Sequence, residues 1–420
     1  MKSFAAILLL SIAVTPALAD ESGLTLPSGF HATIVADGLG AGARHVAVRS
    51  NGDIYVSTRR DRQQASPVGV IALKLDRDHK VVETQHFGNV DGGTGMRLYN
   101  GALYVASQTT LYRYKFKGNE LVPSAPPDVM VDGMPSTGHT NIGIAFDGKG
   151  GLYLSVAGEG NICTDPNTPN GQRPVGLKPC PSLTGRAGVW RFDVNKTYQK
   201  FPADGVQIAT GVRDMFAVDW SKELNGFYGV MQDRNGTSRT FADTITGDAD
   251  ADAIAEEMHR VEKGADLGWP YTYYDRDLKL RVTSPEYGGD GKTPAPGNYS
   301  TPVVAFPAHS SPVDLKFYDG RQFPKAYRGG VFVVFQGGSG PQVAKGRNGY
   351  NLTFVPFDKS GKPGVAQVFA TNFAGPAAEN RNTGKAAYRP SGVTIAPDGS
   401  LYVVDTLKGR LWHISYDGKS

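Results

Sequence analysis

The sequence predicts an all-β fold, and three observations support this. A unit of two short apolar strands joined by a turn rich in Asn, Asp and Gly occurs six times, at residues 45–58, 96–107, 142–156, 216–230, 315–334 and 393–405. Long amphipathic helices are nearly absent, and only 252–262 is expected to form a short one. Glycine is frequent, at 53 of 420 residues, which suits many tight turns.

Further alternating runs between the units predict outer strands, so that each repeat has material for about four strands. These runs lie at 68–76, 110–118, 188–194, 352–358 and 409–416. The first three units are evenly spaced, because Tyr55, Tyr104 and Tyr153 recur every 49 residues. Six four-stranded units predict a six-bladed β-propeller, and the regular spacing disfavours the alternative of paired β-sandwiches.

The beginning of the chain predicts an exported protein. Lys2, the apolar run 4–14 and the small residues Ala17 and Ala19 form the pattern of a secretory signal over residues 1–19. We expect a periplasmic or secreted protein with one propeller domain over 23–420. The segment 30–39 is strand-like and is expected to pair with 409–416 and close the ring.

Composition excludes some classes of partner. The formal charge is only +4, and the Lys and Arg residues are dispersed, so neither nucleic acid nor a membrane surface is an expected partner. After the leader no run approaches eighteen consecutive apolar residues, so no membrane insertion is expected. In an oxidising compartment Cys163 and Cys180 are expected to form a disulfide, which is favoured over a metal pair or redox-active thiols.

Four insertions, at 157–188, 231–262, 270–300 and 336–350, are expected to wall an axial pocket, because propeller sites are built from loops. Four side chains stand at equivalent places before the first strand of different repeats: His139, Arg213, His309 and Arg389. Taken singly, each has a structural explanation, such as an Arg213–Asp214 ion pair. Together they predict a cationic pocket at one mouth of the channel, suited to a polycarboxylate ligand.

With these residues in view, the chain resembles the glucose/sorbosone dehydrogenase family, six-bladed propellers that use pyrroloquinoline quinone (PQQ). The resemblance is carried by HTNIGIAFDGKGGLYLSVAGEG, KGADLGWPY, AHSSPVDLKFYDGRQFPKAYRGGVFV and YRPSGVTIAPDGSLYVVD, in this order along the chain. It covers most of the chain after the leader. The DG-LYV turns are common to many propellers, whereas the ordered set is specific.

The resemblance implies a role for several residues. His139 matches the catalytic base of the family, and Arg213 and Arg389 match arginines that hold PQQ. Asp214 stands where the family has an Asn beside that first arginine, and Lys345 is the counterpart suggested for a cofactor-binding lysine.

The soluble glucose dehydrogenase branch of the family also binds calcium, partly through a Gly-Pro backbone turn. The corresponding stretch here contains Gln232 and Asp233, so a calcium site, if formed, uses these residues or their backbone. A second cofactor-binding arginine of that branch is replaced by Ala387. These departures place the chain nearer the sorbosone and aldose dehydrogenases.

The resemblance implies oxidation of a sugar or alcohol hydroxyl to a carbonyl or lactone, with His139 taking the proton. Electrons are expected to pass to a separate acceptor, a cytochrome or a quinone, because the chain has no CxxCH haem motif. We expect a monomer or a dimer. Two alternatives remain open: a calcium-dependent lactonase-like hydrolase, and a non-catalytic propeller that binds a ligand or partner.

Overall fold

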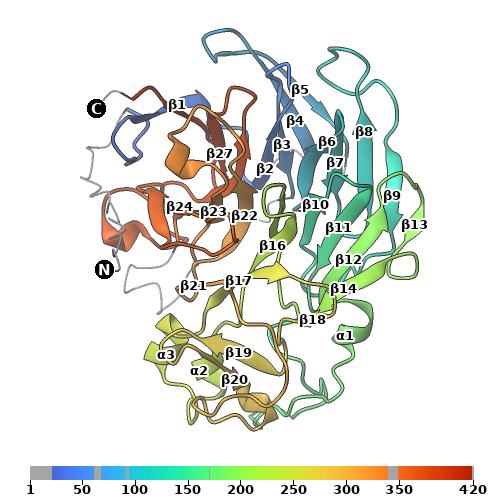
Figure 1. The fold of residues 1–420 in the computed structure, drawn as a ribbon, viewed down its shortest axis with the longest axis vertical. Helices are drawn as coiled ribbons and strands as arrows, with labels where there is room; N and C mark the ends of the chain where they lie inside the picture. Colours follow the sequence, from blue (N-terminus) through green and yellow to red (C-terminus); the bar gives the residue numbers. More distant parts are fainter. Residues whose placement is uncertain are drawn as a thin grey trace, which may run out of the picture.

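The computed structural model describes residues 21–60, 68–89, 91, 94–169, 171–338 and 349–418. It is a six-bladed β-propeller, in which the four-stranded blades follow one another round a ring in chain order (Figure 1). The signal segment 1–19 and Lys345 lie outside the described residues. No helix among those residues is long and apolar enough to cross a membrane.

Each blade is an antiparallel sheet whose strands run from the axis outward. The first three blades are β2 (Ala43–Val48), β3 (Ile54–Thr58), β4 (Gly69–Leu75) and β5 (Val81–Phe87); β6 (Met96–Tyr99), β7 (Ala102–Ala106), β8 (Leu111–Lys115) and β9 (Asp128–Asp132); and β10 (Ile142–Phe146), β11 (Gly151–Val156), β12 (Gly188–Asp193) and β14 (Val206–Thr210). Two short parallel strands, β13 (Gln199–Lys200) and β18 (Ala265–Asp266), extend blades 2 and 3.

The last three blades complete the ring. They are β15 (Ala217–Ser221), β16 (Gly226–Met231), β17 (Glu256–Val261) and β21 (Val304–Phe306); β22 (Pro312–Phe317), β23 (Val331–Phe335), β24 (Asn351–Val355) and β25 (Gln367–Ala370); and β26 (Pro390–Ile395), β27 (Leu401–Asp405), β28 (Leu411–Tyr416) and β1 (Phe30–Ala36). The pairing of β1 with β28 confirms the predicted closure, since the N-terminal strand completes the last blade.

The core is divided among the interfaces between neighbouring blades, each of which holds an apolar cluster. A blade strand is covered on both faces, so β3 is buried throughout although its side chains alternate in direction. Tyr55, Tyr104 and Tyr153 occupy equivalent second strands, and each packs toward the following blade. The 49-residue interval is therefore the length of one blade.

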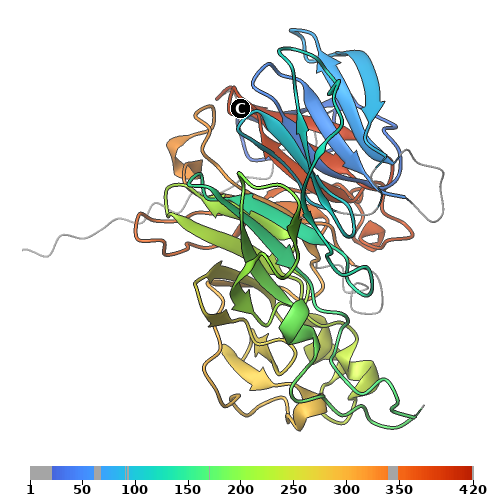
Figure 2. The same ribbon diagram turned by 90° about the vertical axis from the view of Figure 1, so that its right-hand side faces the viewer.

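The insertions within blades 3 and 4 form a lobe beside the ring, which Figure 2 shows in light green to gold. The lobe contains α1 (Ser182–Gly185), α2 (Thr237–Thr240), α3 (Gly247–Asp252), the hairpin of β19 (Thr272–Asp275) and β20 (Leu280–Thr283), and η1 (Pro285–Tyr287). Two further single turns, η2 (Lys325–Tyr327) and η4 (Ala378–Asn380), lie elsewhere. The Cys163–Cys180 disulfide is present in the lobe, as predicted.

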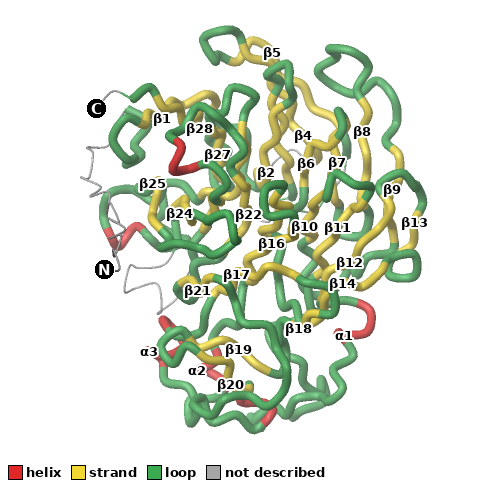
Figure 3. The backbone as a smooth tube through the Cα atoms, viewed as in Figure 1, coloured by secondary structure: helices red, strands yellow, loops and turns green. Residues whose placement is uncertain are grey.

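The prediction of a helix over 252–262 is wrong. That segment contains β17, the third strand of blade 4, and helix α3 ends at Asp252, so helices remain short throughout the described chain (Figure 3). The acidic run 247–252 forms α3, and one of its carboxylates is buried. The Asp250 carboxylate is buried and accepts hydrogen bonds from the backbone N–H groups of Thr237 and Ser238, at the start of α2.

Candidate functional site

The structure brings the predicted positions to one end of the ring axis, here called the mouth. Each of the four stands just before the innermost strand of its blade: His139 before β10, Arg213 before β15, His309 before β22 and Arg389 before β26. The segments beside them are joined by hydrogen bonds, since Gln232 Nε2 donates to Ser311 Oγ over 3.1 Å.

The backbone of His139 is held by Arg186, which the sequence analysis did not single out. Arg186 is buried, and its Nη2 donates to the carbonyl oxygens of His139 (2.9 Å) and Gly158 (3.2 Å). Its Nε donates to the Ala157 carbonyl over 2.9 Å. One guanidinium thus holds the segment before β10 against the segment after β11. Only the tertiary contact reveals this role, because Arg186 lies 47 residues from His139.

The His139 side chain is half-buried, and its Nδ1 is buried with no hydrogen-bond partner among the described residues. Burial lowers the pKa of His139, while the nearby Asp214 carboxylate raises it and the positive charge of Arg213 lowers it further. The net effect is a pKa below the ordinary value for histidine. His139 is therefore a neutral imidazole near neutral pH and has a lone pair available to accept a proton.

The charge of Asp214 interacts with both His139 and Arg213. Its Oδ2 accepts a hydrogen bond from Asn141 Nδ2 over 3.0 Å, whereas its Oδ1 is buried and has no partner in the part of the chain that the structure describes. Burial raises the pKa of Asp214, and the charges of His139 and Arg213 lower it. The carboxyl group thus has one oxygen held by Asn141 and one buried oxygen without a partner among the described residues.

Arg213 is buried and is oriented by two acceptors. Its Nη1 donates to the Gln232 carbonyl over 2.9 Å, and its Nε donates to Asn161 Oδ1 over 3.2 Å. The Asn161 carbonyl in turn accepts from Trp269 Nε1 over 3.2 Å. Burial lowers the pKa of Arg213, and the neighbouring Asp214 offsets part of this effect. A buried guanidinium with few carboxylate partners at hydrogen-bonding distance is suited to an anionic ligand.

Arg389 is oriented in a similar way by the segment after β23. Its Nε donates to the Gln336 carbonyl over 3.3 Å, and its Nη2 donates to the Gly337 carbonyl. The guanidinium carbon of Arg389 also lies 5.9 Å from the centroid of the Tyr350 aromatic ring. The Gln336 side-chain nitrogen is buried without a partner among the residues described, so a hydrogen-bond donor remains available beside Arg389.

His309 differs from the other three. Its Nδ1 lies 2.8 Å from Asn235 Oδ1 and its Nε2 lies 2.7 Å from the Asp250 carbonyl, so both ring nitrogens have protein partners. Its φ of 56° places the backbone in the left-handed region. His309 thus anchors the insertion of blade 4 to the start of blade 5. Its proposed contact with a cofactor remains a prediction.

The two residues suggested for calcium also have protein contacts. The Gln232 carbonyl accepts from Arg213, and Asp233 Oδ1 accepts from the Arg234 N–H over 2.7 Å. Burial and the adjacent Glu257 carboxylate raise the pKa of Asp233 well above its usual range. Asp233 Oδ2 is buried and unpartnered within the described ranges. A metal role for this stretch remains a prediction.

Glu256 is a functional candidate that the sequence analysis missed. It lies at the start of β17, and its carboxylate accepts from the backbone N–H groups of Ser311 (3.1 Å) and Asp233 (3.0 Å). Burial raises its pKa to about 7, although these two hydrogen bonds oppose the shift. The strand pattern EEMHRV was the available signal, but it lies within 252–262, where a helix was expected.

The axis below the mouth is filled by a second polar cluster, here called the mid-axis network: Arg97, His45 and Asp314. Arg97 Nη1 lies 3.1 Å from His45 Nδ1, and Arg97 Nη2 donates to Asp314 Oδ1 over 2.5 Å. Asp314 is fully buried, and its Oδ2 accepts from the Val393 N–H over 3.0 Å. The network joins blades 1, 2, 5 and 6 and closes the axis.

A hollow of about 690 Å³ opens at the opposite end of the axis. It is lined by the hairpins that follow the innermost strands of blades 2 to 5, and ion pairs such as Lys316–Asp219 (3.0 Å) cross it. None of the four mouth residues lines this hollow. The mouth and this hollow are therefore two separate places on the axis.

Comparison with known proteins gives a family match over most of the chain. The family model described as TrAA12-like matches residues 24–275 and 289–417. Among curated proteins, an uncharacterized protein of Borreliella burgdorferi is 24% identical over 213 residues. That match covers 50% of this chain, and it spans only about half of the relative, 48% of its length.

Solved structures share the fold. The chain is similar to Carbohydrate-Active Enzymes Family AA12 of Trichoderma reesei, with 19% identity, a TM-score of 0.73 and coverage of 98% of this chain and 100% of that one. It is similar to the PQQ domain of pyranose dehydrogenase from Coprinopsis cinerea, with 18% identity, a TM-score of 0.72 and coverage of 93% and 97%. The soluble aldose sugar dehydrogenase of Escherichia coli aligns at 13% identity and a TM-score of 0.52, covering 92% and 100%. The six-bladed fold and the resemblance to soluble sugar dehydrogenases are thus confirmed.

The mouth has the chemistry that PQQ requires. PQQ is a planar tricarboxylate, and the mouth offers the buried guanidinium of Arg213, the half-buried guanidinium of Arg389 and the unpartnered amide nitrogen of Gln336. The neutral imidazole of His139 supplies a proton acceptor beside them. These residues fit the group, because unpaired polar atoms of both kinds, donors and acceptors, gather at one end of the axis.

Proposed function

The chain belongs to the TrAA12-like family, and from this premise we propose that it is a PQQ-dependent oxidoreductase that oxidises a hydroxyl group of a sugar or an alcohol. The observation that carries the proposal is the neutral, half-buried His139 beside Arg213 and Asp214 at the mouth. The Coprinopsis cinerea neighbour is described as a holo PQQ domain, which supports the same cofactor here.

Arg213 and Arg389 are the residues proposed to hold the carboxylates of PQQ, with the Gln336 amide as an additional donor. PQQ, when bound, supplies the acceptor for the hydride that leaves the substrate carbon. His139 takes the hydroxyl proton, so that the substrate loses one hydride and one proton and becomes a carbonyl compound or a lactone. Arg186 keeps the His139 backbone in place for this transfer.

A Ca²⁺ ion is proposed as a second ligand of the mouth. One Trichoderma reesei structure of similar fold is described as a calcium structure. In this chain Asp214 Oδ1 and Asp233 Oδ2 are carboxyl oxygens without hydrogen-bond partners among the described residues. Carboxylate oxygens are the ligands that Ca²⁺ prefers.

Export to the periplasm or medium is part of the proposal, supported by the leader-like residues 1–19 and by the disulfide. The two electrons then pass to a separate acceptor, a cytochrome or a quinone. Mass spectrometry of the protein purified from a secreting host should give a mature chain that begins close to Asp20. A retained leader would contradict export.

The deciding experiment loads the purified protein with PQQ, with and without CaCl₂, and measures reduction of an artificial dye with a panel of aldoses and alcohols. We expect PQQ binding and substrate-dependent dye reduction. His139→Ala should lower kcat by about 10²–10⁴-fold and leave PQQ affinity largely intact, because the general base is removed but the arginines remain. His86→Ala, at an exposed position on β5, is the matched control and should behave as wild type.

Failure of the wild-type protein both to bind PQQ and to reduce the dye would overturn the proposal. PQQ binding without turnover of any compound in the panel would instead favour a non-catalytic ligand-binding propeller. Hydrolysis of lactones in the presence of Ca²⁺ alone would favour the lactonase-like alternative.

A further inference from the structure

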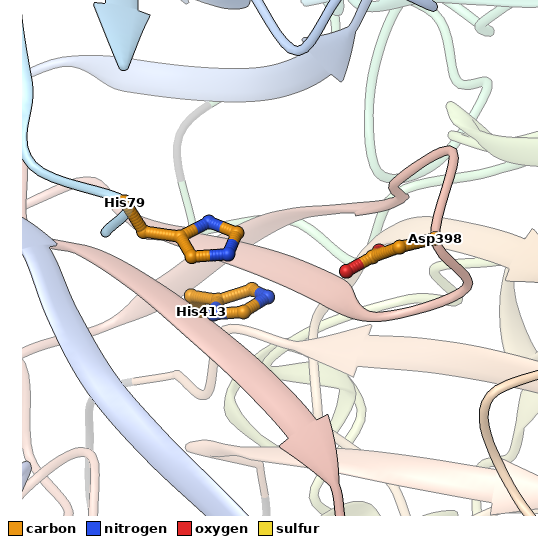
Figure 4. A group of neighbouring side chains, drawn as sticks. All are labelled: His79, Asp398 and His413. Carbon is orange, nitrogen blue, oxygen red and sulfur yellow. The ribbon is translucent and has the colours of Figure 1, made fainter. Parts of the chain in front are cut away.

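A separate cluster of potential ligand side chains lies outside the mouth, at the seam where blade 6 meets blade 1. It consists of His79, in the turn between β4 and β5, Asp398, in the turn between β26 and β27, and His413 on β28. Their ligand atoms all lie within 4.8 Å of one another. Figure 4 shows the two imidazoles one above the other, each with a nitrogen toward the Asp398 carboxylate.

His413 is the buried member of the cluster. Its exposed fraction is only 8%, and its Nε2 has no hydrogen-bond partner in the described parts of the chain. An unpaired polar atom in such a place is destabilising unless a ligand occupies it. His413 Nε2 is therefore a nitrogen that a ligand in the cluster can occupy.

His79 is oriented by a hydrogen bond on its other nitrogen. Its Nδ1 lies 2.9 Å from the Tyr402 hydroxyl, which leaves Nε2 as the nitrogen that faces the cluster. The two rings stack with centroids 4.3 Å apart and planes inclined by 20°. A partner that fixes the far nitrogen of a histidine is the usual arrangement around metal-binding imidazoles.

Asp398 completes the cluster with a carboxylate oxygen that makes only a weak hydrogen bond elsewhere. Its Oδ1 accepts from the Ser400 backbone N–H (2.9 Å) and hydroxyl (2.6 Å). Its Oδ2 has only a long contact, 3.4 Å, with Gln322 Nε2. Ser400 thus fixes the carboxylate plane and leaves one oxygen for a ligand.

We propose that His79, Asp398 and His413 form a Zn²⁺ site that links blade 6 to blade 1. Two imidazoles and one carboxylate are a ligand set for zinc, with water in the fourth position, whereas Ca²⁺ and Mg²⁺ prefer oxygen ligands. Zinc holds its ligands at about 2.0–2.2 Å, so the three atoms approach one another on binding. His79 and Asp398 lie on exposed turns, where a side chain makes such an adjustment more easily than the buried His413 on β28.

The proposed ion would stabilise the closure of the propeller ring. Blade 6 is the composite blade that contains both chain ends, β1 and β28, and His413 lies on the strand that pairs with β1. A metal between this strand and the β4–β5 turn ties the closing blade to the first blade. The expected result of binding is a more stable ring, because a ligand that binds only the folded state raises the unfolding temperature.

The test uses full-length protein without a histidine tag, stripped with EDTA. Isothermal titration with ZnCl₂ should show one site, zinc should raise Tm, and an excess of CaCl₂ should not compete with zinc for this site. His79→Gln and Asp398→Asn remove ligands at positions on surface turns, where folding is expected to tolerate them, and each should weaken zinc binding at least tenfold. His86→Gln, on β5 of the same blade, is the matched control and should bind as wild type.

Tyr402→Phe gives a second, independent readout, because it leaves all three ligands but removes the partner of His79 Nδ1. It should weaken zinc binding about 10–100-fold. Absence of zinc binding in the wild type would overturn the proposal, as would equal zinc affinity in His79→Gln, Asp398→Asn and His86→Gln. Neither readout depends on PQQ or on activity, so the result is separate from that of the proposed function.

Discussion

The mid-axis network and the mouth contain the same residue types, yet their carboxylates are paired differently. Asp314 accepts from Arg97 and the Leu315 N–H on Oδ1 and from the Val393 N–H on Oδ2. Asp214 accepts from Asn141 on one oxygen, and the other has no partner among the described residues. A buried carboxylate with both oxygens hydrogen-bonded holds blades together, whereas one with an unpartnered oxygen is available to a ligand.

The largest expected effect is on stability. Asp314→Asn should lower the free energy of unfolding by about 3–5 kcal/mol, because it leaves the buried Arg97 guanidinium without its counter-charge. Asp214→Asn is the matched change at the mouth and should alter stability by less than about 1 kcal/mol, since Asp214 accepts only from the Asn141 amide and its Oδ1 has no partner among the described residues. Urea denaturation of both variants measures the difference. Equal losses would remove the distinction between the two clusters.

An intermediate effect is expected on cofactor binding. Arg213→Gln should weaken PQQ binding about 10–100-fold, as expected for the loss of a charge-assisted hydrogen bond of roughly 1.5–3 kcal/mol. Arg260→Gln, at an exposed position on β17 of the same blade, is the control. Fluorescence titration with PQQ compares the three proteins. Unchanged affinity in Arg213→Gln would place the cofactor away from the mouth.

The smallest effect is a shift in pH dependence. The Asp214 carboxylate raises the pKa of His139, so its removal in Asp214→Asn lowers that pKa further below the ordinary value. The acidic limb of kcat/KM, where the base becomes protonated, should therefore move to lower pH by about one unit. A pH–rate profile of PQQ-loaded protein measures it. A shift to higher pH would contradict the assignment of His139 as the base.

The repeat pattern was sufficient to predict the architecture because strands and turns depend mainly on residues that are close together in the sequence. The alternation of apolar residues, the Gly- and Asn-rich turns and the 49-residue spacing of Tyr55, Tyr104 and Tyr153 are properties of neighbouring residues, and each blade repeats them. The prediction was wrong at 252–262, where a short amphipathic helix was expected. There the pairing of β17 with β16 and β21 overrides propensity.

The partners of the polar side chains required the folded ring. Equivalent positions in the repeats were enough to predict that His139, Arg213 and Arg389 share one mouth. Nothing in the order of residues indicates that Arg186 holds the His139 backbone or that His309 is already paired with Asn235. Likewise His79 and His413 lie far apart in the sequence and meet only where the ring closes. Strand formation depends on neighbours along the chain, whereas pairing and desolvation of charges depend on what the ring brings together.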